Sequence, residues 1–179
     1  MRTITCKALF GVLCLLLFGV FTARPASALT VGNCINSAAI SYASGLTSIK
    51  QNEAITINAV FTGCVFPTGP APALFKWTGT AYNVACTNVQ GDSVSLGDGT
   101  LTWNNGSTGS AELVSLTNVG LSGVTPATAN FKIISGTGAG TTFTVVDAFV
   151  PVLNQLTCSD SNPIYILTGT GTDAALPSL

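Results

Sequence analysis

Hydrophobic and polar residues alternate along much of this chain. In the stretch 54–61, Ile55, Ile57, Ala59 and Phe61 occupy every second position, and the same period of two returns at 130–133 and 142–145. A period of two predicts strands that bury one face and expose the other. The sequence contains no sustained period of 3.6, so we expect about eight to ten short strands and no long helix.

Glycine-containing turns separate these runs. Gly97-Asp98-Gly99 and Asn104-Asn105-Gly106-Ser107 both follow strand-like segments, and glycine after Asp or Asn accepts the positive φ of tight hairpins. We also expect a turn at Thr78-Gly79. The pattern as a whole predicts an all-β protein, and we expect an antiparallel Ig-like β-sandwich, with a flattened barrel as the alternative.

The first residues predict an export signal. Arg2 and Lys7 precede the apolar stretch 8–23, and Ala26-Ser27-Ala28 supplies the small residues of a cleavage site. The alternative is a membrane anchor, but the stretch is shorter than the roughly 20 residues that a spanning helix needs. We therefore expect a signal peptide at 1–28 cleaved after Ala28, one domain at 29–172, a flexible tail at 173–179, and a secreted or extracellular protein with no membrane segment after cleavage.

Charge composition excludes several functions. The chain has no His, and cleavage would leave Lys50, Lys76 and Lys132 as its basic residues, beside seven acidic ones. A chain without His has no Ser-His-Asp triad and no His metal ligand, and one without Arg has no arginine finger. So little positive charge also argues against nucleic acid as a partner.

Four cysteines remain after cleavage: Cys34, Cys64, Cys86 and Cys158. An even number in an exported chain predicts two disulfides, and the alternative of a zinc site lacks the usual Cys-x-x-Cys pair. If the strands near 31–42 and 54–64 pair across a loop centred near residue 48, Cys34 lies opposite Cys64. The prediction is therefore Cys34–Cys64 and Cys86–Cys158, although a register slip of one residue would separate the first pair.

The order of these features resembles a group of small exported all-β proteins of actinobacteria, which have no assigned function. The features that carry the resemblance are the four cysteines, the stretch Tyr42-Ala43-Ser44-Gly45-Leu46-Thr47 and the segment from Gly99 to Thr108. The resemblance implies an exported all-β fold and supplies no active site.

Three residues are candidates for ligand contact. Trp77 lies beside Lys76 and the expected turn, which suggests an exposed ring that could stack on a sugar together with Tyr82, whereas Trp103 shares a strand face with Leu101 and is expected in the core. Asp147 falls on the same strand face as Phe143, Val145 and Phe149. A buried carboxylate is costly and typical of functional sites, while a bulge or a hydrogen-bonded structural role is the simpler interpretation.

These observations favour a secreted or cell-surface, non-catalytic structural or interaction module. The expected partner is a cell-wall polysaccharide or a surface protein, and we expect no catalytic residue, cofactor or metal. The alternatives are a carbohydrate-binding module and a hydrolase built on carboxylates. The second needs two acids about 5–10 Å apart, and nothing in the sequence pairs them.

Overall fold

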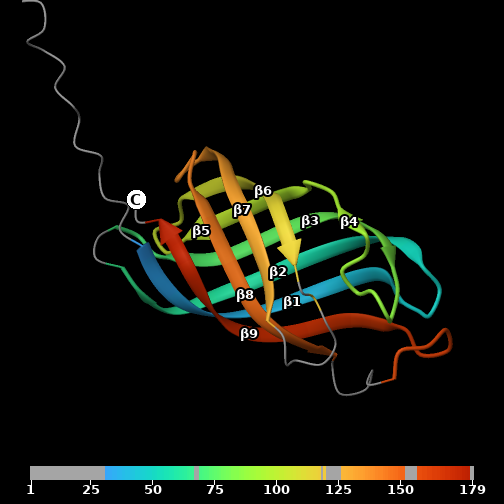
Figure 1. Ribbon diagram of the computed structural model, residues 1–179. Coiled ribbons are helices and arrows are strands. Elements are labelled where there is room, and N and C mark those ends of the chain that lie inside the picture. The colour runs from blue at the N-terminus through green and yellow to red at the C-terminus, as the bar shows by residue number, and fades with distance from the viewer. Residues whose placement is uncertain (1–30, 67–68, 118, 120–125, 152–156, 178–179) are drawn as a thin grey trace, which may run out of the picture.

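The described part of the chain forms nine antiparallel strands (Figure 1). The structure is a computed structural model that describes residues 31–66, 69–117, 119, 126–151 and 157–177, without the side chains of Val31 and 172–177. The predicted signal peptide lies outside these residues. The strands are β1 (Val31–Leu46), β2 (Gln51–Val65), β3 (Pro72–Val84), β4 (Ser93–Val94), β5 (Asp98–Trp103), β6 (Thr108–Thr117), β7 (Ala127–Gly136), β8 (Thr142–Pro151) and β9 (Ile164–Pro177).

Eight of these strands close into a barrel. With β4 set aside, each strand pairs with the next along the chain, including β2 with β3 and β3 with β5, and the pairing of β9 with β1 closes the ring. The short β4 pairs with β3. The all-β antiparallel class is confirmed. Of the two predicted architectures the structure has the barrel, because its strands belong to one continuous sheet rather than two facing sheets.

Large side chains fill the barrel, as the alternation predicted. The rings of Phe75 and Phe131 lie 4.5 Å apart between centroids, those of Phe75 and Phe143 lie 5.0 Å apart, and Trp77 packs against Phe131 at 6.3 Å. Edge-to-face pairs of this kind contribute about 0.5–1.5 kcal/mol each beyond the burial of their area. This aromatic cluster, with Leu101 beside it, forms the centre of the core.

The predicted turn at Thr78-Gly79 is wrong, because β3 runs straight through it from Pro72 to Val84. Gly79 has a packing role instead. A Cβ atom at this position would lie 2.3 Å from the ring of Trp77, so the indole occupies the space that any larger side chain would need. The sequence alone does not distinguish a glycine that makes room for a neighbouring ring within a strand from a glycine that forms a turn.

Both predicted disulfides are confirmed, at Cys34–Cys64 and Cys86–Cys158. Most of the β1–β2 register sets Ile40 opposite Ile57, a spacing that would place Cys34 opposite Gly63. The register shifts by one residue next to Cys34, where Gly63 adopts a φ of 58°. This glycine bulge corrects the register and brings the two cysteines face to face.

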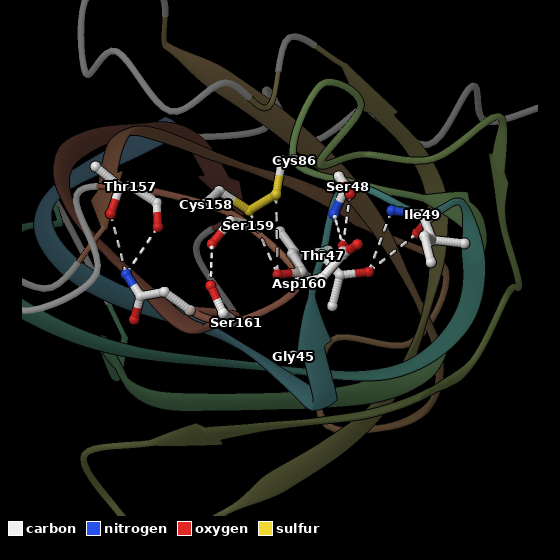
Figure 2. Close-up of a disulfide and its surroundings, with 12 residues drawn as sticks. Gly45, Thr47, Ser48, Ile49, Cys86, Thr157, Cys158, Ser159, Asp160 and Ser161 are labelled. Atoms are coloured by element: carbon white, nitrogen blue, oxygen red, sulfur yellow. Dashed lines mark hydrogen bonds between the residues drawn. A yellow bond between two sulfur atoms is a disulfide. The ribbon is translucent and has the colours of Figure 1, made fainter.

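The second disulfide fastens one end of the barrel, which we call the loop rim and define by residues 47–50, 85–92 and 157–163. Figure 2 shows Cys86 bonded to Cys158 beside Ser48 and Asp160. The Ser48 amide and hydroxyl both donate to the Asp160 carboxylate, which ties two of these loops together. Three connecting segments are thus held as one unit at the loop rim.

The last strand extends beyond the domain boundary that we expected at Thr172. β9 continues to Pro177, which pairs with Val31 at the start of β1. The stretch predicted to be a flexible tail from residue 173 therefore contributes backbone pairing to the barrel wall as far as Pro177.

Candidate functional site

Trp77, the expected sugar-stacking residue, lies in the core. Its side chain is 0% exposed, and its Nε1 donates to the carbonyl oxygen of Leu96 at 2.9 Å. The expectation of an exposed Trp77 is therefore wrong, because the Thr-Gly pair that suggested a turn belongs to a continuous strand. Trp103, at 2% exposed, is in the core as expected.

The tyrosines divide between surface and interior. Tyr82 is 39% exposed and can be reached by a ligand, and Tyr165 also lies at the surface. Tyr42 is buried and its hydroxyl donates to the carbonyl oxygen of Val89 at 2.9 Å, which draws the 85–92 loop over the barrel. Burial raises the pKa of the Tyr42 phenol above its ordinary value, because the charged form would lose its hydration.

Asp147 points into the barrel, as the alternation of β8 predicted. It is 1% exposed, and its backbone pairs with Ala127 on β7 and Gly171 on β9, neither of which carries a polar side chain. Neither carboxylate oxygen has a hydrogen-bond partner within the described residues. Burial therefore raises the pKa of Asp147 to about 6, so the carboxyl group takes up a proton readily inside the fold.

The second buried acid among the described residues has a hydrogen-bond partner, unlike Asp147. Glu53, the other buried acid of the described residues, accepts a hydrogen bond from the Ser44 amide at 2.9 Å, which makes it a structural carboxylate near the β1–β2 turn. In the part of the chain that the structure describes, no three His, Cys, Asp or Glu side chains gather as metal ligands would.

A slot lies in the barrel wall between β4 and the C-terminal half of β6. β5 pairs with β6 only as far as Ala111, so β6 runs past its neighbour toward the loop rim. We call this gap the β4–β6 slot. Its volume is about 260 Å³, and it is lined by Gln90, Asp92, Ser93, Val94, Leu96, Leu113, Val114, Ser115 and Leu116.

The slot combines an apolar wall with two oriented polar groups. Ser115 lies on β6, and its Oγ accepts a hydrogen bond from Asn130 Nδ2 at 2.8 Å. Asp92 lies on the facing loop, where its Oδ1 accepts from Asn88 Nδ2 at 2.9 Å and lies 3.7 Å from Lys50 Nζ. A hydroxyl on one wall and a carboxylate on the other can bind a ligand that has both donors and acceptors.

Several main-chain groups at the slot already have partners. The Leu113 amide donates to Leu96 O at 2.9 Å, and Gln90 Nε2 donates to Leu116 O at 2.7 Å. The Asp92 amide, on the other wall, donates to the Tyr82 carbonyl at 2.8 Å. A ligand in the slot would therefore meet side chains rather than these strand edges.

The slot could not be predicted from the sequence because its walls come from separate segments, 90–96 and 113–116. Its structural origin is a difference in strand length, since β6 (Thr108–Thr117) extends beyond its hairpin partner β5 (Asp98–Trp103). A difference in length between two strands of a hairpin indicates such a gap only when the pairing of the strands is known.

Comparison with known proteins gives no functional assignment. No protein-family model, no curated protein and no solved structure matches this chain. Within the described residues, no helix has the length and apolar character needed to cross a membrane.

Proposed function

We propose that the mature chain is an exported, non-catalytic interaction module that binds its partner through the β4–β6 slot. The observation that carries this proposal is the contrast between the two sides of the barrel wall. The interior is packed with apolar side chains, whereas the slot presents Ser115 and Asp92 beside an apolar surface. Sites that bind small ligands are concave and mostly apolar, with a few oriented polar groups.

Export is supported by the disulfides. The two bonds connect residues separated by 30 and 72 positions. Disulfides persist in oxidising compartments outside the cytoplasm. The predicted signal peptide and the resemblance to exported actinobacterial proteins support the same location. A protein at the cell surface has the cell-wall polysaccharide and neighbouring surface proteins as its available partners, and we favour the polysaccharide because the slot is small.

The chemistry of the slot supports binding without catalysis. Asp92 is the one acidic residue among those that line it, and its carboxylate already contacts Asn88 and Lys50. Hydrolysis of a glycosidic bond ordinarily uses two carboxyl groups on either side of the bond. A single carboxylate can accept hydrogen bonds from a ligand and hold it in place.

The proposal can be tested by sedimentation with insoluble cell-wall polysaccharide from an actinobacterium. We expect the mature protein to sediment with the polysaccharide, and Ser115→Trp, which fills the slot, to stay in the supernatant. Thr102→Trp, a matched change on the outer wall away from the slot, should sediment like the parent. Retention of the parent in the supernatant, or the appearance of new reducing ends in the polysaccharide, would overturn the proposal.

A further inference from the structure

We infer that the β4–β6 slot binds a single neutral sugar ring, with Ser115 as the hydrogen-bond donor and Asp92 as the acceptor. The inference rests on the proposed function and names the ligand class of the same site. A sugar ring offers hydroxyl groups that both donate and accept around its edge, and C–H faces that pack against apolar side chains. The slot presents the complementary groups on its two walls.

The donor is oriented by a chain of side-chain hydrogen bonds across three strands. Thr144 Oγ1 donates to Asn130 Oδ1 at 2.7 Å, which fixes the orientation of the Asn130 amide. The amide nitrogen then donates to Ser115 Oγ at 2.8 Å. Because Ser115 Oγ is the acceptor in that bond, its own proton must point elsewhere, and no other described group accepts it. The residue lines the slot, so the proton is available to a ligand oxygen there.

The acceptor is held on the opposite wall by two neighbours. Asn88 Nδ2 donates to Asp92 Oδ1, and the ammonium group of Lys50 lies 3.7 Å from the same oxygen. Both contacts use Oδ1, which leaves Oδ2 as an acceptor for ligand hydroxyl groups. A hydrogen bond from a neutral donor to a carboxylate is stronger than one between two neutral groups.

The size and apolar lining of the slot favour one ring. A volume of about 260 Å³ lies just below the range of about 300–1,000 Å³ typical of small-molecule pockets, so a single ring matches it better than a longer ligand. Val94 and Leu96 on one side and Val114 on the other supply aliphatic surface.

An extended peptide is the less suitable occupant. A peptide that adds to a sheet gains its affinity from main-chain hydrogen bonds to a free strand edge. At this slot the Leu113 amide and the Leu116 carbonyl are already bonded to Leu96 and Gln90. The Ser115 hydroxyl and the Asp92 carboxylate are side-chain groups that a ligand can still reach, and with the Ser93 hydroxyl they suit a hydroxyl-rich ligand.

Trp77 provides a reporter directly beneath the slot. Its Nε1 donates to the carbonyl oxygen of Leu96, which lines the slot, and its ring lies against Gly97, where a Cβ would be 2.4 Å from the indole. A ligand that contacts Leu96 should change the hydrogen bond at the indole and therefore its fluorescence. Trp103→Phe removes the other tryptophan, so that the signal comes from Trp77 alone.

The test is a fluorescence titration of the Trp103→Phe protein with glucose, N-acetylglucosamine and their β-linked trimers. We expect a saturable change with at least one of these sugars. Ser115→Ala and Asp92→Asn should each weaken binding about tenfold, which corresponds to the loss of about one such hydrogen bond. Thr102→Ala, which removes a hydroxyl elsewhere on the outer wall, should bind like the parent.

Asn130→Asp tests the orientation of the donor. This change keeps the shape of the side chain but replaces the donating amide by an acceptor, so that Ser115 can donate its proton to the new carboxylate instead of the ligand. We expect weaker sugar binding while the thermal unfolding profile stays cooperative. Equal affinity of the parent, Ser115→Ala and Asn130→Asp would overturn the inference.

The outcomes also separate this inference from the proposed function. If no sugar changes the fluorescence but the parent still sediments with the polysaccharide and Ser115→Trp does not, the interaction module stands and the sugar-ring assignment is wrong. If a short extended peptide saturates the signal where every sugar fails, the assignment is likewise wrong. If neither titration nor sedimentation detects binding, both proposals fail.

Discussion

Replacement of Asp147 by asparagine should remove a pH dependence of stability that the buried carboxyl imposes on the barrel. The side chain is 1% exposed, and its oxygens have no hydrogen-bond partner among the described residues. Burial penalises the charged form and raises the pKa of Asp147 to about 6 in the folded chain, whereas the ordinary pKa of 3.8 applies to the unfolded chain. The group therefore favours folding most in acid, and that contribution is lost as the pH rises from 3.8 to about 6.

The magnitude follows from the difference between these pKa values. Each pKa unit corresponds to about 1.4 kcal/mol, so the rise from 3.8 to about 6 makes ionised Asp147 cost the folded state about 3 kcal/mol at neutral pH. Asp147→Asn carries no titrating proton. We expect it to match the parent to within about 1 kcal/mol near pH 4, and to be more stable by about 2–3 kcal/mol near pH 7.

The assay is urea unfolding with both disulfides intact, followed by tryptophan fluorescence at several pH values between about 4 and 7. The difference between parent and variant isolates Asp147, because every other acidic group is common to both. Asp98→Asn, at an exposed position at the start of β5, is the matched control and should leave the profile of the parent unchanged. A difference between parent and Asp147→Asn that stays constant over the whole pH range would refute the reasoning.

Three further predictions concern the packing of the barrel. Gly79→Ala should destabilise the fold by about 2–3 kcal/mol in urea unfolding, because the new methyl group would overlap the Trp77 ring; an unchanged midpoint would show that the indole can move aside. The double variant Cys86→Ser, Cys158→Ser should lose about 4 kcal/mol, as expected for opening a loop with a separation of 72 residues, and calorimetry would detect the lower melting temperature. Tyr42→Phe should cost about 1 kcal/mol and increase hydrogen exchange of the 85–92 loop, since the hydroxyl bonds that loop to the barrel; exchange equal to that of the parent would argue against this anchor.

The elements that sequence predicts best are those with local causes. The alternation in 54–61 identifies the buried face of β2 because side chains alternate across any strand. The pairing of Cys34 with Cys64 could be inferred from one hairpin, and the bulge at Gly63 shifts the register so that the two cysteines lie opposite each other. Closure into a barrel depends on pairings between distant strands, such as β1 with β9, and the alternation of a single strand is the same in a barrel and a sandwich.

The candidate site was harder to predict for the same reason. Asp147 could be placed inside the barrel because its orientation depends only on the period of β8. Trp77 was misplaced because a glycine two residues later has two roles, turn former or space for a ring, and only the tertiary packing distinguishes them. Ser115 and Asp92 belong to no motif in the sequence, and only the folded chain shows that they line the same slot.

The pairing of Val31 with Pro177 has a consequence for how the domain can be attached to another protein. Both ends of the barrel chain leave from the same rim, opposite the loop rim that the Cys86–Cys158 bond fastens. A segment joined to either end would therefore attach at the rim opposite the loop rim and leave the loop rim accessible. Insertion into a larger protein would need only a short connector, because the two ends are neighbours in one ladder.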